Sequence, residues 1–296
     1  MNLQPELQTA LDQAQQPSIQ PAPLHVPQPT PKPSAQTVLA LKNLKMSFGA
    51  KEVLRGVDLE AGRGEIIGYI GPNGAGKSTT VKIMLGLIEG YSGTVEILGE
   101  DIRTSGVSYK RHIGYVPETA DLYDNLTPRE YLTFVGELYG MSFEDADRKA
   151  EALVTLFGIK DVYHSRMTSF SKGMRQKVLL IASILHDPDI LFLDEPLSGL
   201  DANSVMVVKE LLEALAKAGK TIFYSSHIMD VVEKISHRIV LLDGGHIVAN
   251  GTFEDLKDLN HEGSLEAIFN QLTGFDTQSE TARQILQVIR GVNRDE

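Results

Sequence analysis

The chain has 296 residues, of which 42% are hydrophobic and 23% are charged, an ordinary composition for a globular protein with a sizeable core. A formal net charge of -11 argues against general binding to nucleic acid and against direct adhesion to anionic lipid. The lack of cysteine excludes disulfides and thiolate metal sites, and no stretch is apolar over the roughly 18–20 residues that span a bilayer.

Residues 1–37 differ in composition from everything after them. They hold eight of the 13 prolines and very few charged side chains. Such a segment buries too little apolar surface to offset the entropy lost on ordering, so we expect it to be disordered. The alternative is a short initial helix, because Leu3, Leu7 and Leu11 recur at helical spacing.

Strands and helices are predicted in alternation after this segment. Apolar alternation and short apolar runs predict strands at 38–48, 52–59, 65–70, 91–98, 190–193 and 221–225, and a hairpin at 238–249. Helical spacing predicts helices at 77–87, about 128–139, 143–157, 174–186 and 203–218. Thr127 and Glu130 form a capping box around Pro128, which indicates a helix start. The alternation predicts an α/β fold with a mainly parallel sheet.

A glycine-rich loop between a predicted strand and a predicted helix fits the pattern G-x-x-x-x-G-K-[ST]. Its residues are Gly71, Pro72, Asn73, Gly74, Ala75, Gly76, Lys77 and Ser78. The glycines let backbone N–H groups point at phosphate oxygens, and the following helix adds its positive end. We therefore expect Lys77 to bind the β- and γ-phosphates of ATP, Ser78 to bind Mg²⁺, and Thr79 to contact the α-phosphate. A plain glycine-rich turn is the alternative interpretation.

Polar residues follow two predicted central strands, where ligands of open α/β sheets bind. Asp194 and Glu195 come after the run at 190–193. We expect Asp194 to bind Mg²⁺ and Glu195 to orient the water that attacks ATP. His227 follows the next strand and is expected to donate a hydrogen bond to the γ-phosphate. The alternatives are an acidic strand end and a structural histidine.

The segment 170–177 precedes a predicted helix. With this segment included, residues 38 to 250 resemble the ATPases of ABC transporters. The resemblance rests on ordered motifs, namely the phosphate loop, the signature Ser171-Lys172-Gly173-Met174, the acids after 190–193, the loop 198–201 and His227. It implies a P-loop NTPase core with an antiparallel β subdomain and an inserted α-helical subdomain at about 119–186. The ATPase domain would then span 38–251, with a helical extension at 252–296.

The resemblance also implies a mechanism shared between two chains. The signature of one chain would cover the ATP bound by the other, with the Ser171 hydroxyl and the Gly173 amide aimed at the γ-phosphate. Asp201 would belong to the loop that crosses to the partner, and Phe48 would stack on the adenine. The alternatives are a helix N-cap for Ser171, a role compatible with the first, and a packed strand aromatic for Phe48.

Three positions depart from the common pattern of the family. Glu118 stands where a glutamine is usual, and its carboxylate also suits Mg²⁺ but adds negative charge near the γ-phosphate. Lys172 and Met174 replace glycine and glutamine. These departures, together with the segment 264–274, resemble the ATPases of bacterial drug, lipid and polysaccharide exporters, so we expect an exporter.

The implied partners are a transmembrane permease and a second ATPase subunit, identical or related, with no nucleic acid and no direct membrane insertion. The chain would lie in the cytoplasm, on the inner face of the membrane. Phe134, Leu138 and Tyr139 are candidates for the permease groove, although we favour the core of the helical subdomain for them. A soluble ABC-type ATPase of translation or DNA maintenance, and a module that binds ATP without hydrolysis, are the alternative functions.

Overall fold

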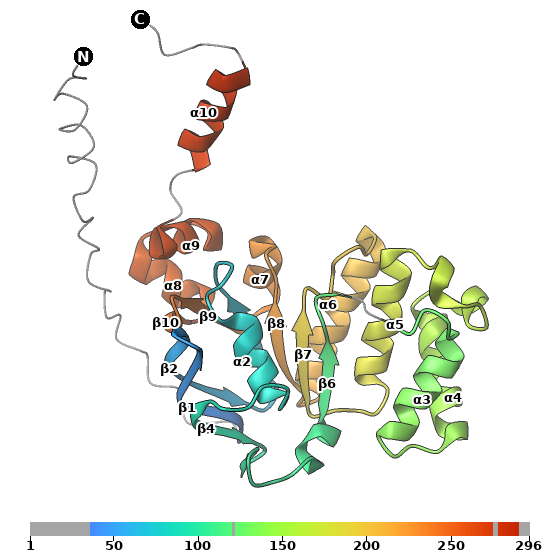
Figure 1. The fold of residues 1–296 in the computed structure, drawn as a ribbon. Coiled ribbons are helices and arrows are strands. Elements are labelled where there is room, and N and C mark those ends of the chain that lie inside the picture. The colour runs from blue at the N-terminus through green and yellow to red at the C-terminus, as the bar shows by residue number, and fades with distance from the viewer. Residues whose placement is uncertain (1–35, 120–121, 275–277, 290–296) are drawn as a thin grey trace, which may run out of the picture.

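The computed structural model describes residues 36–119, 122–274 and 278–289, which build a mixed α/β fold with two sheets and packed helices (Figure 1). The prediction made for residues 1–37 falls almost wholly outside the described residues. The proposed domain boundaries remain predictions.

An antiparallel sheet of four strands in the order β2-β1-β4-β5 opens the fold. The strands are β1 (Thr37–Phe48), β2 (Lys51–Gly62), β4 (Ser92–Ile97) and β5 (Glu100–Asp101). The end of β1 alternates as predicted, because Leu44 and Met46 are buried while Lys45 and Ser47 are exposed. Strand β5 has no signal in the sequence, since two residues are too few to contain an alternating pattern.

The second sheet has six strands in the order β10-β9-β3-β8-β7-β6. Its strands are β3 (Ile66–Ile70), β6 (Ile113–Val116), β7 (Ile190–Asp194), β8 (Thr221–Ser225), β9 (Arg238–Asp243) and β10 (His246–Gly251). The pairs from β9 through to β6 are parallel, and β10 is antiparallel to β9. Every residue of β3 and β8 is buried, as expected for strands covered on both faces. The carboxyl ends of β3, β7 and β8 therefore share one edge of the sheet.

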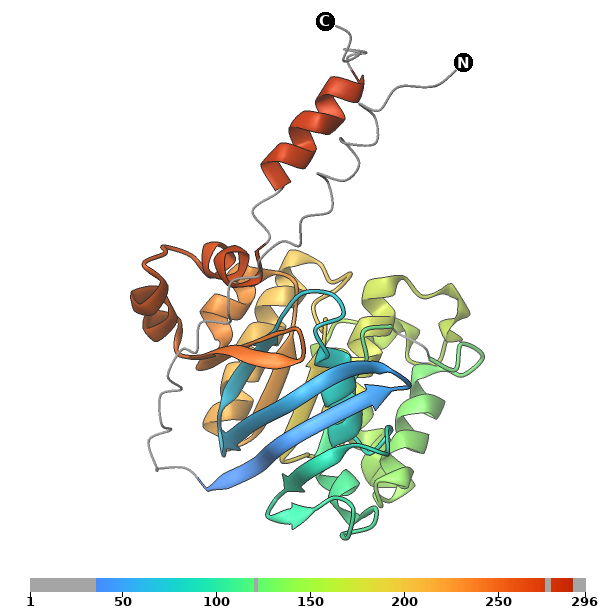
Figure 2. The same cartoon turned by 60° about the vertical axis from the view of Figure 1, so that its left-hand side comes forward.

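Helix α2 (Lys77–Met84) lies between the two sheets, and Figure 2 shows the antiparallel sheet in front of it. Its buried Val81, Ile83 and Met84 belong to a core that also contains residues of both sheets. The other face of the six-stranded sheet is covered by α5 (Lys172–Ile184), α6 (Ala202–Lys217) and α7 (Met229–Ile235). Helix α2 ends three residues before the predicted end, where Gly86 turns the chain with a φ of 63°.

A helical region formed by α3 (Pro128–Leu138), α4 (Phe143–Leu156) and α5 lies beside the six-stranded sheet (Figure 1). The predicted capping box is confirmed, because Thr127 accepts a hydrogen bond from the Glu130 amide and the Thr127 amide donates to Glu130. Helix α5 begins two residues before the predicted start, because Ser171 is its N-cap.

The interpretation of Phe134 and Leu138 as core residues is wrong. Their exposures are 46% and 68%, and Tyr139 is half-buried. The face of α3 that packs inward carries Leu132, Thr133 and Gly136, so the two apolar side chains lie on another face of the helix.

The remaining helices follow the sheets. They are α8 (Phe253–Asn260), α9 (Leu265–Thr273) and α10 (Gln278–Ile289), with short 3₁₀ turns at Ser108–His112, Lys160–Val162 and Met167–Ser169. Leu265 and Ile268 of α9 are fully buried and join the core that includes α7. On α10 the apolar side chains Ile285, Leu286, Val288 and Ile289 are exposed.

Candidate active site

The glycine-rich loop connects β3 to α2 and depends on glycine at two places. Gly76 has a φ of 111°, a conformation that other residues rarely adopt. A Cβ on Gly71 would lie 2.1 Å from the Leu242 carbonyl oxygen, so a side chain there would displace the loop. Close packing against β9 thus sets the start of the loop, and the helix begins directly at Lys77.

Lys77 lies among the charged side chains of the candidate site. Its Nζ donates hydrogen bonds to the Gly71 carbonyl over 2.6 Å and to the Pro72 carbonyl over 3.1 Å. Burial lowers the pKa of Lys77, and the nearby carboxylates of Asp194, Glu195 and Glu118 oppose that shift. The ammonium group is therefore held beside three acids that come from distant parts of the sequence.

A pocket of about 290 Å³ opens beside this loop. It is lined by Lys51, Val53, Asn73, Gly74, Gly76, Lys77, Ser78, Thr79, Glu118, Asp194, Ser225 and His227. The tertiary structure thus brings together most of the predicted loop, both predicted metal acids and the predicted histidine. Sequence reasoning missed Lys51, Val53 and Ser225. Lys51 and Val53 follow Phe48 in the β1–β2 hairpin. Their closeness in sequence to this predicted adenine contact could have indicated that they belong to the site.

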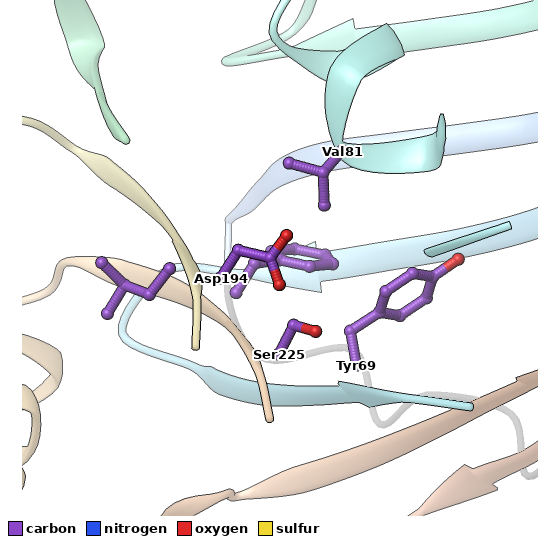
Figure 3. A pocket seen from close by; sticks show the side chains of 6 residues that line it. Tyr69, Val81, Asp194 and Ser225 are labelled. Carbon is purple, nitrogen blue, oxygen red and sulfur yellow. The ribbon is translucent and has the colours of Figure 1, made fainter. Parts of the chain in front are cut away.

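Asp194 ends β7 and pairs in register with Ser225 of β8. Burial raises the pKa of the Asp194 carboxyl, Glu118 adds to the rise, and the Ser225 hydroxyl, Lys77 and His227 oppose it. Figure 3 shows Asp194 and Ser225 beside Tyr69 and Val81, around a cavity of only about 10 Å³. The side chains around this cavity are therefore tightly packed, and Asp194 also lines the larger pocket.

Glu195 leaves β7 in a left-handed conformation with a φ of 48°, and its amide donates to the Ser225 carbonyl over 2.9 Å. One carboxylate oxygen, Oε1, accepts the amide of His227 over 2.6 Å, and the other, Oε2, accepts the Ser226 hydroxyl over 3.2 Å. The His227 Nε2 atom lies 3.9 Å from Oε1. The carboxylate is thus attached to the end of the neighbouring strand, and its side chain is 17% exposed.

Phe48 ends β1 with half of its surface exposed, so the alternative of a packed strand aromatic is wrong. Its exposed ring is available for stacking, and the adenine contact stays a prediction. Phe48, Gly71, Pro72 and Ala75 do not themselves line the pocket. Ala75 is buried below the loop.

The signature lies elsewhere in this chain. The Ser171 hydroxyl accepts the Met174 amide over 3.3 Å, so the predicted N-cap role is confirmed. The Lys172 Nζ donates to the Ser198 hydroxyl over 2.6 Å, and a Cβ on Gly173 would lie 2.4 Å from the Gly199 carbonyl oxygen. The signature is therefore packed onto the loop at 198–201.

Asp201 completes that loop as the N-cap of α6. It accepts hydrogen bonds from the amide and the hydroxyl of Ser204 over 2.9 and 2.6 Å, and these bonds lower the pKa of its carboxyl to about 2. Ten predicted site residues that the structure describes do not line the pocket: Phe48, Gly71, Pro72, Ala75, Ser171, Lys172, Gly173, Met174, Glu195 and Asp201.

The chain is similar in sequence to a known family and to proteins of Bacillus subtilis. The sequence model of a family described as "ABC transporter" matches residues 54–198. The linearmycin resistance ATP-binding protein LnrL of Bacillus subtilis (strain 168) is 35% identical over 74% of this chain and 70% of its own length. The ABC transporter ATP-binding protein NatA of the same organism is 36% identical over 74% of this chain and 89% of its own length.

A solved structure titled "Structure of ATP binding subunit of ABC transporter" superimposes with a TM-score of 0.75 and 34% identity, over 80% of this chain and 99% of that chain. Among the helices that the structure describes here, none is long and apolar enough to cross a membrane.

Proposed function

Because this chain belongs to the ABC transporter family and is an ATP-binding, ATP-hydrolysing subunit, we propose that it closes on ATP as one half of a head-to-tail dimer and thereby drives a membrane permease. The second half is another copy or a related chain. One observation carries the proposal: the phosphate loop, Asp194 and His227 share one pocket, while the signature of the same chain lies outside it. A second chain would supply the missing cover.

Two features of the signature support this cover. Ser171 begins α5, so the positive end of a helix with 13 residues lies beside the signature. Such a helix end favours the negative charge of a phosphate. The Lys172 ammonium adds positive charge at the same end of the helix.

The donors in the pocket suit Mg²⁺. The hydroxyl of Ser78 and the carboxylates of Asp194 and Glu118 provide oxygen ligands, which Mg²⁺ prefers, and one or two carboxylates suffice when phosphates complete the shell. When bound there, Mg²⁺ neutralises phosphate charge. Around it, Lys77 binds the phosphates, Glu195 orients and polarises the attacking water, and His227 donates to the γ-phosphate.

We assign the partner to the membrane, with the chain at its cytoplasmic face. The exposed Phe134 and Leu138 of α3 form an apolar surface that a permease segment can cover. Export is the favoured direction, which is supported by Glu118, Lys172 and Met174 and by the segment 264–274, where the sequence resembles bacterial exporters.

The first test is Glu195→Gln. It should keep ATP binding, lower turnover by about a hundredfold or more through loss of a positioned base, and accumulate an ATP-bound dimer in size-exclusion chromatography. Wild-type turnover in this variant would contradict the role of Glu195.

The partner is tested by capturing the Glu195→Gln variant with ATP from detergent extract. Recovery of a multi-span membrane protein supports the proposal, and recovery of ribosomal or DNA-maintenance factors instead would replace it by the soluble alternative. Lys77→Ala, which should not close on ATP, is the matched control for ATP-dependent capture.

A further inference from the structure

The residue between β8 and His227 binds the oxygen of the Glu195 carboxylate that the His227 amide does not bind. Ser226 is 4% exposed, its hydroxyl donates to Glu195 Oε2 over 3.2 Å, and its Oγ accepts the Ile228 amide over 3.2 Å. The other oxygen, Oε1, accepts the His227 amide. Two donors from consecutive residues thus bind both oxygens of one carboxylate.

This double attachment matters because a glutamate side chain has several rotatable bonds. With the His227 amide alone, the carboxylate could still rotate about a single hydrogen bond. The Ser226 hydroxyl fixes the plane of the carboxylate as well as its position. A carboxylate has about four acceptor sites, so two remain for a water molecule in the pocket.

We propose that Ser226 is a positioning residue for ATP hydrolysis: its hydroxyl orients the Glu195 carboxylate toward the attacking water. The inference rests on the role proposed above for Glu195. Ser226 acts through Glu195, and neither residue is among those that line the pocket. Its removal should therefore change the rate of the chemical step and leave nucleotide binding nearly intact.

The test compares steady-state ATPase kinetics, nucleotide affinity and thermal unfolding of two variants. Ser226→Ala should lower kcat about tenfold with KM and ATP affinity within about twofold of wild type. Ser226→Thr retains the hydroxyl and should restore at least about a third of the wild-type kcat.

The matched control is Ser183→Ala. Ser183 is also a buried serine, 3% exposed, and its hydroxyl donates to the Leu180 carbonyl in α5. This variant should lose a similar amount of thermal stability and keep its kcat. Equal losses of kcat in Ser183→Ala and Ser226→Ala would overturn the inference, as would a failure of Ser226→Thr to exceed Ser226→Ala.

Glu195→Gln, measured in parallel, distinguishes a failure of the proposed role of Glu195 from a failure of the inference about Ser226. If Glu195→Gln hydrolyses ATP at the wild-type rate, the proposed role of Glu195 fails, and the inference about Ser226 fails with it. If Glu195→Gln is inactive while Ser226→Ala turns over at the wild-type rate, the role of Glu195 stands and the inference about Ser226 alone is wrong.

Discussion

The pocket and the signature are built by opposite means. The pocket collects side chains from β2, the phosphate loop, β7 and β8 around one volume, with Lys77 beside three acids. In the signature, backbone packs against backbone where Gly173 lies on Gly199, and Ser171 caps its own helix. The first arrangement prepares a site for a polyanion, and the second presents a rigid, positively polarised helix end. The difference fits the proposed dimer, in which the pocket of one chain and the signature of another form one site.

The largest expected effect comes from removing the central charge of the pocket. Lys77→Ala should weaken ATP binding by about a hundredfold or more, because the ammonium is the main counter-charge to the phosphates. Isothermal titration with ATP measures the affinity. Lys217→Ala on the exposed face of α6 should leave the affinity unchanged, and equal effects of both variants would contradict a special role for Lys77.

A mixing experiment tests whether the two halves belong to different sites. Lys77→Ala inactivates the pocket and Ser171→Arg inactivates the signature, so each variant alone should be nearly inactive. Mixed chains form one intact site, and turnover should exceed that of either variant by about tenfold or more. Thermal unfolding checks that Ser171→Arg stays folded after losing its cap. Turnover that stays at the level of the separate variants would contradict the assignment of the two halves to different chains.

The edge of the pocket should contribute less than its centre. Phe48→Ala should weaken ATP binding about tenfold without abolishing it, because stacking on a base contributes about 1–3 kcal/mol in other nucleotide complexes. GTP should compete with ATP for the wild-type site, since stacking tolerates both bases. Phe48→Tyr is the matched variant and should bind like wild type. An unchanged affinity in Phe48→Ala would remove Phe48 from the site.

The smallest expected effect concerns stability without ligands. Burial raises the pKa of Asp194 above its ordinary value of 3.8, so the folded state holds this proton more tightly than the unfolded state. The free energy of unfolding therefore falls as the pH rises through these two pKa values, and the ionised carboxylate destabilises the fold at pH 7. Asp194→Asn should abolish hydrolysis yet raise Tm by about 2 °C without nucleotide or metal.

The gain in Tm should shrink as the pH falls toward the raised pKa of Asp194, because the wild-type carboxyl then becomes protonated. Asp161→Asn, at an exposed position, should not change Tm at any pH. A lower Tm for Asp194→Asn at pH 7 would show that the carboxylate stabilises the fold, contrary to its burial.

Local signals explain why much of the fold could be predicted. The capping box at Thr127 and Glu130 satisfies helix-end donors with side chains that are three residues apart, so it can be recognised without the tertiary structure. Helix α7 gave no such signal, because it has seven residues and no side-chain cap. The exposure of Phe134 and Leu138 was also missed, since the face of a helix that packs inward depends on its neighbours.

By itself the sequence determined the parts whose chemistry depends on neighbours along the chain: the phosphate loop, the acids that end β7, the strands and most helix starts. Only the tertiary structure decided which of these parts meet. It placed Lys51, Val53 and Ser225 in the pocket, attached Glu195 to Ser226 and His227, and kept the signature outside. The physical reason is that strand pairing and side-chain packing act between residues far apart in the chain, whereas local spacing records only helix periods, strand alternation and caps.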